Sequence, residues 1–412
     1  MSWLVGGARR LGKALERRGK RLLVHLFARL FRARPQAPEG PRARPMRLLV
    51  IRLDPRLGNV LMTTPLLASL RERYADAAID ALVHPYAARV LADHPARIRT
   101  LPFRRWAWWS PEGPWRRVRA LRRQGYDLCF DATNPTCPSV TQALVARAAR
   151  ARCTVGYDVA PVASLYNVAI ATAGHDAGGL HEIERRLALL APLGPGPLPR
   201  LPSVGPLAAA ARAPMRAFLE QMHGRTFVVL NLGARAAARR VSPADGATVA
   251  NLCKSLGFTP VLVAGLGEKR LCAEVLSLSL DVLVAPDANL ADLALLFSRA
   301  TACVSGDTGP MHLSVAMGCP TLGIFSASCP HRYGYRTGPH DVVDARGQHG
   351  AAWAGEARAY LARRQRAWAA SVADLPSEPS VAGWRPQAMS ASHLAARAAR
   401  AERPLGGVPG GR

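Results

Sequence analysis

The chain has 412 residues, of which 49% are hydrophobic, so it is long enough for two folded domains with sizeable cores. The formal net charge of +27 at pH 7 points to an anionic partner, which is a nucleic acid, a membrane surface or a phosphorylated substrate. Eight cysteines are scattered without a CxxC pair or a metal-like Cys/His spacing. This pattern argues against structural zinc and a disulfide framework, and it favours a reduced, cytosolic protein.

Both ends of the chain are strongly basic. In residues 1–45, arginine and lysine interleave with leucine and phenylalanine at helical spacing. The apolar run is too short to span a bilayer and lacks the cleavage site of a secretory signal. The spacing predicts an amphipathic helix on anionic lipid, and the alternative is a solvated tail. Residues 341–412 are rich in Ala, Arg, Gly and Pro, which predicts a partly helical or disordered tail.

Strands and helices alternate through residues 46–200. The pattern predicts strands at 46–53, 78–83, 98–103 and 126–131, and helices at 60–74, 87–91 and 115–124. Such alternation predicts a parallel sheet with helices on both faces, which binds ligands at the carboxyl ends of its strands. The loop 54–59 is therefore a candidate wall of a site. Residues 104–109 and 115–123 mix tryptophan with arginine, which suits a membrane interface, although the indoles can equally pack on the domain.

The alternation resumes after the proline- and glycine-rich segment 192–206, which is the best candidate for a domain boundary. Strands are predicted at 226–231, 259–264 and 300–304, and helices at 269–278 and 290–299, the latter capped by Asn289. A small basic loop, 233–240, follows the first of these strands. The second domain is expected to cover residues 201–340.

The segment 304–312 combines a buried strand, a polar turn and a helix that begins near Pro310 and runs to about 317, before Gly318. Such a junction directs free backbone N–H groups and the positive end of the helix dipole at one point. This arrangement predicts a phosphate or diphosphate site. Asp307 and His312 are expected to face it. The alternative is an ordinary strand–helix junction capped by Asp307 and Thr308.

Four motifs in this order resemble glycosyltransferase family 9, the ADP-heptose:lipopolysaccharide heptosyltransferases. They comprise 49–67, 231–240, 307–312 and 318–325, and the helix 181–190 also fits. The resemblance covers about residues 46–330. It implies a GT-B fold, in which two Rossmann-like doubly wound domains face each other across a cleft. The domain 46–200 would bind the acceptor, and the domain 201–340 would bind the nucleotide sugar.

The resemblance also implies an activity. The chain would move a heptose from ADP-heptose to the lipopolysaccharide inner core, with inversion and without a metal ion or cofactor. A monomer in the cytoplasm, peripheral on the inner face of the membrane, is expected, and no nucleic-acid-binding module is recognisable. The donor-binding residues implied by the resemblance are Arg235, Arg239, Arg240, Glu268, Asp307, Thr308, Gly309 and His312. Among these, Glu268 would lie near the ribose, and Asp307 would contact sugar hydroxyls.

One position departs from the family pattern. The family has a catalytic aspartate after the glycine of its first loop, where this chain has Asn59. An amide cannot accept a proton, and general-base catalysis contributes about 10²–10⁴-fold. Asp54, five residues earlier in the same loop, is the candidate replacement, and the alternative is an ordinary loop residue that precedes Pro55. Three hypotheses follow: an active transferase that uses Asp54 or another carboxylate, a weak transferase that relies on positioning, and a membrane-bound homologue that binds the donor without catalysis. Activity is preferred because the donor motifs are intact.

Overall fold

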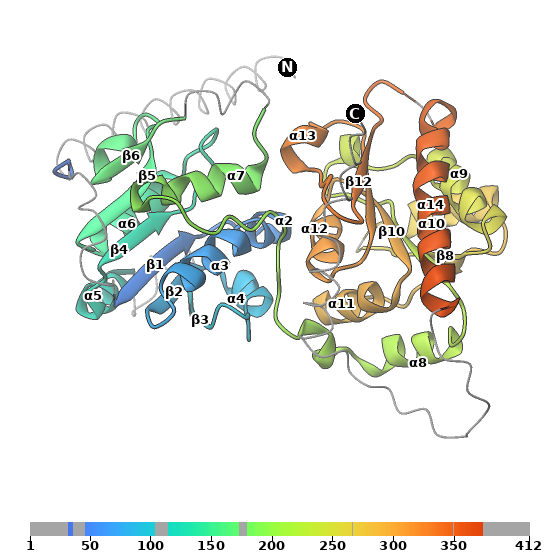
Figure 1. The fold of residues 1–412 in the computed structure, drawn as a ribbon, viewed down its shortest axis with the longest axis horizontal. Helices are drawn as coiled ribbons and strands as arrows, with labels where there is room; N and C mark the ends of the chain where they lie inside the picture. The colour runs from blue at the N-terminus through green and yellow to red at the C-terminus, as the bar shows by residue number, and fades with distance from the viewer. Residues whose placement is uncertain are drawn as a thin grey trace, which may run out of the picture.

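The computed structural model describes residues 32–35, 46–103, 114–172, 179–265, 267–348 and 350–373. These residues form two α/β lobes that meet along one side (Figure 1). Each lobe contains a six-stranded sheet, with the orders β3-β2-β1-β4-β5-β6 and β12-β11-β10-β7-β8-β9. Every pairing in both sheets is parallel. Both orders are those of a Rossmann fold, so the predicted pair of doubly wound domains is confirmed.

The first lobe has the strands β1 Arg47–Arg52, β2 Ala78–Val83, β3 Ile98–Pro102, β4 Leu128–Asp131, β5 Cys153–Tyr157 and β6 Val168–Ile170. Its helices are α2 Leu57–Leu61, α3 Thr64–Arg73, α4 Pro85–Val90, α5 Pro114–Gln124, α6 Val140–Ala148 and α7 Glu182–Leu187, with 3₁₀ turns η2 Ala163–Leu165 and η3 Ala188–Leu193. All residues of β1 after Arg47 are buried, as expected for a central strand covered on both faces. The single helix predicted at 60–74 is two helices, because Met62 ends α2 and Thr63 precedes α3.

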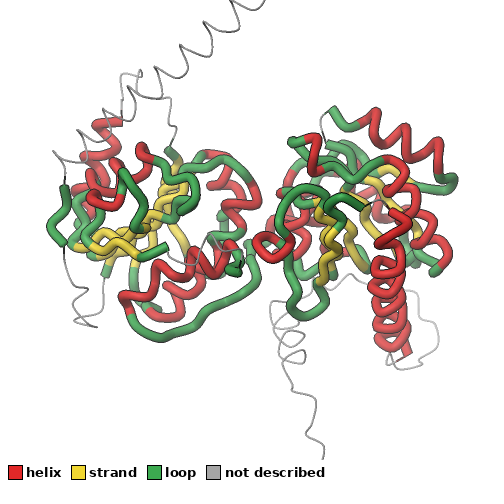
Figure 2. Tube along the Cα trace, turned by 90° about the horizontal axis from the view of Figure 1, so that it is seen from above, coloured by secondary structure: helices red, strands yellow, loops and turns green. Residues whose placement is uncertain are grey.

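The second lobe has the strands β7 Phe227–Asn231, β8 Thr259–Leu262, β9 Leu283–Val284, β10 Ala302–Gly306, β11 Thr321–Phe325 and β12 Asp341–Asp344. Its helices are α8 Ala213–Gln221, α9 Pro243–Ser255, α10 Lys269–Leu278, α11 Leu290–Arg299, α12 Gly309–Ala316, α13 Pro330–Tyr333 and α14 Gly350–Ala373, with 3₁₀ turns η4 Leu207–Ala210 and η5 Ala237–Arg239. Helices flank the strands of each lobe (Figure 2). Asn289 caps α11 as predicted.

The tail expected at 341–412 is helical in part, as α14 shows, but its described residues also pack onto the second lobe. β12 is the outer strand of the second sheet and pairs with β11. α14 packs along the same lobe and buries Trp353, Tyr360 and Leu361. The composition suggests a tail because these few large apolar residues stand among many alanines and arginines. Residues 1–31, 36–45, 104–113 and 374–412, which include most of the two basic ends and the tryptophan-rich segment, lie outside the described part of the chain.

The lobes are joined by the chain connection and by a close helix–helix contact, among other contacts. The connection after η3 first follows the first lobe, where Ser203 N donates to Thr64 Oγ1 at 2.9 Å. It then enters η4, which packs against α11. Between the lobes, α2 lies against α12. A Cβ on Gly58 would lie 2.5 Å from His312 Cδ2, and one on Gly309 would lie 2.9 Å from Leu57 Cβ. The absence of both side chains is what allows these helices to approach so closely.

Candidate active site

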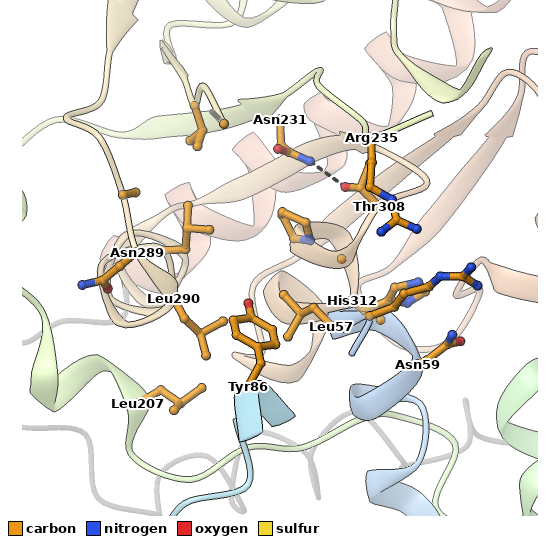
Figure 3. A pocket seen from close by; sticks show the side chains of 18 of the residues that line it. Leu57, Asn59, Tyr86, Leu207, Asn231, Arg235, Asn289, Leu290, Thr308 and His312 are labelled. Carbon is orange, nitrogen blue, oxygen red and sulfur yellow. Dashed lines mark hydrogen bonds between the residues drawn. The ribbon is translucent and has the colours of Figure 1, made fainter. Parts of the chain in front are cut away.

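A cleft of about 1330 Å³ lies between the lobes. The loop and helix after β1, α4 after β2 and the loop after β4 form its first wall. The loops after β7, β8 and β10 and the start of α11 form its second. These loops follow the neighbouring strands β1 and β4 in one sheet and β7 and β10 in the other, where the chain order reverses. Open α/β sheets bind ligands at this switch point. Figure 3 shows Leu57 of the first lobe close to His312 of the second, whereas the Thr308 side chain is directed at Asn231.

The start of α12 forms part of the second wall. Thr308, Gly309 and Pro310 line the cleft. Thr308 is the N-cap residue, but its side chain makes no capping hydrogen bond. Instead Thr308 Oγ1 accepts a hydrogen bond from Asn231 Nδ2 at 2.9 Å (Figure 3). The first N–H groups of a helix have no intrahelical acceptor, and here the Thr308 side chain does not accept from them either. The capped-junction alternative therefore does not hold for Thr308, and the anion site remains a prediction.

The three arginines of the loop after β7 have different environments. Arg235 and Arg239 line the cleft. Arg239 Nη1 lies 3.1 Å from Asp307 Oδ2. Arg240 is not among the described residues that line the cleft, and its Nε donates to the carbonyl oxygen of Ala234 at 2.9 Å. Of the adjacent pair, only Arg239 is placed to contact a ligand in the cleft.

Asp307 lies at the carboxyl end of β10 and is only 3% exposed. Its Oδ2 accepts a hydrogen bond from Ser328 Oγ at 2.5 Å. Burial raises the pKa of Asp307, while Ser328 and the charge of Arg239 oppose that shift. The carboxylate is thus fixed in direction and can accept hydrogen bonds from hydroxyl groups of a ligand.

His312 lines the cleft from the first turns of α12. Burial, followed by the charges of His181, Arg186 and Arg239, lowers the pKa of His312 to about 3. The imidazole is therefore neutral at pH 7, and its 3.8 Å approach to Asp307 Oδ1 is not an ion pair. Its Nδ1 lies 2.8 Å from the Tyr335 hydroxyl. His312 can contribute a hydrogen bond to a ligand but no charge.

Glu268 lines the cleft beside the loop after β7. Its Oε2 accepts a hydrogen bond from Gly265 N at 2.7 Å. A Cβ on Gly233 would overlap the Glu268 carboxylate, so the glycine allows the carboxylate to lie over the β7 loop. The chain thus places a carboxylate on the same wall as the α12 N-terminus.

Asn59 and Asp54 form a pair in the loop and helix after β1. Asn59 lines the cleft, and its Nδ2 donates to Asp54 Oδ2 at 2.7 Å. Asp54 is not among the described residues that line the cleft. Its carboxylate also lies 3.4 Å from Arg52 Nη2 and accepts from Arg56 N at 2.9 Å. The amide therefore faces the cleft, and the carboxylate lies directly behind it.

Sequence reasoning assigned no role to a buried ionic cluster on the first lobe. Glu182, 1% exposed, accepts from Arg332 Nε of the other lobe at 2.6 Å and lies 3.1 Å from Arg186 Nη1. Burial alone would raise the pKa of Glu182, but the charges of Arg186 and Arg332 outweigh it and lower the pKa. The sequence predicts the helix at 181–190 that contains Glu182 and Arg186, but no motif in it indicates that α13 lies opposite.

No group of three or more His, Cys, Asp and Glu side chains in the ranges described is placed to hold a metal ion. No helix in these ranges is both long enough and apolar enough to cross a membrane.

Comparison with known proteins identifies the family of the chain. The model of glycosyltransferase family 9 (heptosyltransferase) matches residues 115–349, more than half of the chain. Lipopolysaccharide heptosyltransferase 1 of Pseudomonas aeruginosa is 29% identical over 298 residues, covering 69% of this chain and 80% of that protein.

Two solved structures show the same fold. The E. coli heptosyltransferase WaaC with ADP is 22% identical, with a TM-score of 0.60 and coverage of 77% of this chain and 100% of that one. E. coli ADP-heptose lps heptosyltransferase II is 19% identical, with a TM-score of 0.61 and coverage of 79% and 100%. The expected GT-B fold is therefore confirmed. The chain belongs to glycosyltransferase family 9 (heptosyltransferase) and is a glycosyltransferase.

Proposed function

We propose that the chain transfers a heptose from ADP-heptose to an inner-core acceptor of lipopolysaccharide, with inversion and without a metal ion. The observation that carries the proposal is the combination of the α12 N-terminus, Arg239 and Asp307 on one wall of the interlobe cleft. The relatives named above carry heptosyltransferase names, and one solved structure contains ADP. Both support a donor of this class.

The proposed chemistry needs a counter-charge for the departing diphosphate. As the sugar leaves, negative charge grows on the phosphate oxygens. The N–H groups of Thr308 and Gly309, the dipole of α12 and the guanidinium of Arg239 are available to stabilise that charge. Asp307 holds Arg239 in place and is proposed to accept hydrogen bonds from sugar hydroxyls.

The rest of the donor has a matching surface. Glu268 is proposed to accept hydrogen bonds from the ribose hydroxyls. Val263, Ala288 and Leu290 line the same cleft and offer an apolar surface for a flat base. Arg235 and His312 are proposed to contact the donor from the cleft wall, whereas Arg240 is proposed to hold the loop through its bond to Ala234.

Proton removal from the acceptor is proposed to depend on Asp54. In this proposal the Asn59 side chain orients the acceptor hydroxyl, and Asp54, hydrogen-bonded to Asn59 at 2.7 Å, receives the proton after a small movement of the amide. The attack comes from the first lobe, opposite the diphosphate on the second, which gives inversion. The acceptor is proposed to bind the domain 46–200 and the donor the domain 201–340.

A second candidate function rests on Asn59 itself. Because the side chain that faces the cleft is an amide, and the nearby carboxylate already binds Arg52 and Asn59, the chain can bind a nucleotide sugar without efficient transfer. The two candidates share the donor site and differ only in turnover.

Transfer and binding must therefore be measured together. Purified protein is mixed with ADP-heptose and a Kdo–lipid A acceptor, the acceptor is weighed by mass spectrometry, and ADP binding is followed by calorimetry. The proposed transferase increases the acceptor mass by one heptose, whereas ADP binding without that increase favours the second candidate. Asp54→Ala is expected to abolish transfer, and unchanged turnover would remove Asp54 as the base. Asn59→Asp is expected to accelerate a transferase whose base is impaired.

We also propose that the enzyme works as a monomer at the inner face of the cytoplasmic membrane. The basic residues 1–45 are the proposed anchor, and the exposed arginines of α5, such as Arg116, Arg119 and Arg123, add positive charge on the first lobe. Deleting residues 1–45 is expected to move the protein from the membrane to the soluble fraction of a cell lysate. An unchanged distribution would reject the anchor.

A further inference from the structure

We propose that Arg332 is a positioning residue for transfer: its ion pair with Glu182 holds the two lobes closed and fixes Asn59 at the cleft. Arg332 belongs to α13 of the second lobe, and Glu182 begins α7 of the first. The proposal rests on the proposed function, because the closed lobes are inferred to bring donor and acceptor together.

The contact of α13 with the first lobe is polar and contains several hydrogen bonds. Arg332 Nε and Nη2 both lie 2.6 Å from Glu182 Oε1. Arg332 Nη2 also donates to Thr136 Oγ1 at 3.0 Å and to Asn134 Oδ1 at 3.4 Å. One guanidinium of the second lobe thus bonds to two separate segments of the first lobe, the loop after β4 and the start of α7.

Burial distinguishes this contact from an ordinary surface ion pair. Glu182 is 1% exposed, and the Arg332 side chain is 22% exposed. Exposed pairs contribute little, whereas separating a buried pair costs both partners their charge compensation and hydrogen bonds. Arg185 and Arg186 stay near Glu182, so without Arg332 its charge is compensated only in part and its Oε1 loses two hydrogen-bond donors. Opening the lobes would therefore be opposed by the cost of separating Glu182 from Arg332.

The ion pair is connected to the catalytic wall. Glu182 Oε2 lies 3.1 Å from Arg186 Nη1, and Arg186 Nη2 donates to Asn59 Oδ1 at 3.4 Å. Asn59 in turn donates to Asp54. A continuous chain of polar contacts therefore runs from Arg332 of the second lobe to the residues proposed to handle the acceptor hydroxyl. In Figure 1, α13 and α7 face each other on one side of the α2–α12 contact, and the covalent linker passes on the other side. The Arg332–Glu182 pair therefore joins the lobes on the side opposite the linker.

The connection lets closure and positioning depend on each other. When the lobes meet, Arg332 completes the set of charges around Glu182, and Arg186 is held between Glu182 and Asn59. Positioning errors of about 1 Å at a reacting group can cost about 10²-fold in rate. Loss of Arg332 is therefore expected to slow turnover more than it weakens donor binding, because the proposed donor contacts all lie on the second lobe.

The test compares Arg332→Ala with Arg336→Ala, a matched control whose guanidinium pairs with Asp341 inside the second lobe. Transfer kinetics are expected to show kcat lowered about 10- to 100-fold in Arg332→Ala, with the ADP dissociation constant within about twofold of wild type. Thr136→Val, which removes one hydroxyl partner of Arg332 and leaves both charges, is expected to cause a smaller loss, and Arg332→Lys is expected to recover part of the activity.

Hydrogen exchange provides a readout that does not need activity. Backbone amides of α2, which α12 covers across the gap, are expected to exchange faster in Arg332→Ala than in wild type and in Arg336→Ala, with and without ADP. Equal exchange of α2 in both variants, or equal kcat, would overturn the proposal. A wild-type chain that neither binds ADP nor transfers a sugar would contradict the proposed function, and the exchange comparison on the ligand-free chain would still decide whether Arg332 closes the lobes.

Discussion

Arg239→Ala is the substitution that most sharply tests how the cleft binds a diphosphate. Arg239 Nη1 is 3.1 Å from Asp307 Oδ2, and the residue lines the cleft beside the α12 N-terminus. Its neighbour Arg240 is also exposed but bonds to its own loop through Ala234 and does not line the described cleft. The two side chains have the same chemistry and adjacent positions, so Arg240→Ala is a matched control.

The expected loss follows from the geometry. A hydrogen bond to a charged group contributes about 1.5–3 kcal/mol, and each 1.36 kcal/mol corresponds to about a tenfold change in rate. The Arg239 side chain is 44% exposed, which places it in the lower half of that range because of solvent screening. We expect kcat to fall about 10- to 40-fold, and the ADP dissociation constant to rise less, because charge on the leaving diphosphate is greatest in the transition state.

A pH profile gives a second signature of the same substitution. Burial already raises the pKa of Asp307, and Arg239 opposes that shift. Without Arg239 the pKa of Asp307 rises further, so the acidic limb of the kcat profile is expected to move to higher pH. Steady-state kinetics with ADP-heptose across the pH range would measure both effects. Equal kcat and equal profiles for Arg239→Ala and Arg240→Ala would refute a role for Arg239 at the diphosphate.

Three further predictions concern the lobes and their packing. Gly58→Ala would place a Cβ 2.5 Å from His312 Cδ2, so it is expected to separate α2 from α12 and to lower kcat at least about tenfold. The control is Gly179→Ala, which has open space around the new Cβ and should leave kcat unchanged. Equal kcat in the two variants would contradict the close approach of the helices. Trp353→Ala is expected to lower the free energy of unfolding by about 3–5 kcal/mol in urea titrations, since the indole is 1% exposed, and a loss below about 1 kcal/mol would show that α14 is not anchored there. Burial lowers the pKa of His94 to about 4, below its value of about 6.5 in the unfolded chain. Between these pH values the unfolded state binds one more proton than the folded state. The free energy of unfolding therefore decreases as the pH falls from about 6.5 to 4. Asp131, whose pKa burial raises to about 6, has the opposite effect on stability below pH 6. The wild type is therefore compared with His94→Gln, which should show a weaker dependence of the unfolding free energy on pH. An unchanged pH dependence in His94→Gln would show that His94 is not its source.

The sequence predicted the second-lobe wall of the cleft more fully than the first-lobe wall. The strand–turn–helix at 304–312 is local in the chain, so its geometry could be expected from residue order alone. The structure places Thr308, Gly309 and Asp307 in the cleft as that order suggests. The assignment of both Arg239 and Arg240 to the donor could not be refined from the sequence, because the direction of two adjacent side chains depends on the folded loop.

The interlobe contacts could not be predicted in this way. Arg332 and Glu182 are 150 positions apart, and neither occupies a motif that indicates its partner. The close approach of α2 to α12 depends on Gly58 and Gly309. Glycine occurs at turns and helix ends for many other reasons, so these two residues do not by themselves predict a helix–helix contact. Likewise, the burial of Trp353 is invisible in a composition of alanine and arginine. Contacts of long sequence separation follow from how the two sheets meet, and local propensity carries no information about that.

A crystal structure of the chain with ADP bound would test the proposed diphosphate site most directly. We expect the terminal phosphate oxygens to lie about 3 Å from the backbone N–H groups of Thr308 and Gly309 and from the guanidinium of Arg239. A nucleotide bound outside the interlobe cleft, or a diphosphate directed away from the start of α12, would contradict it.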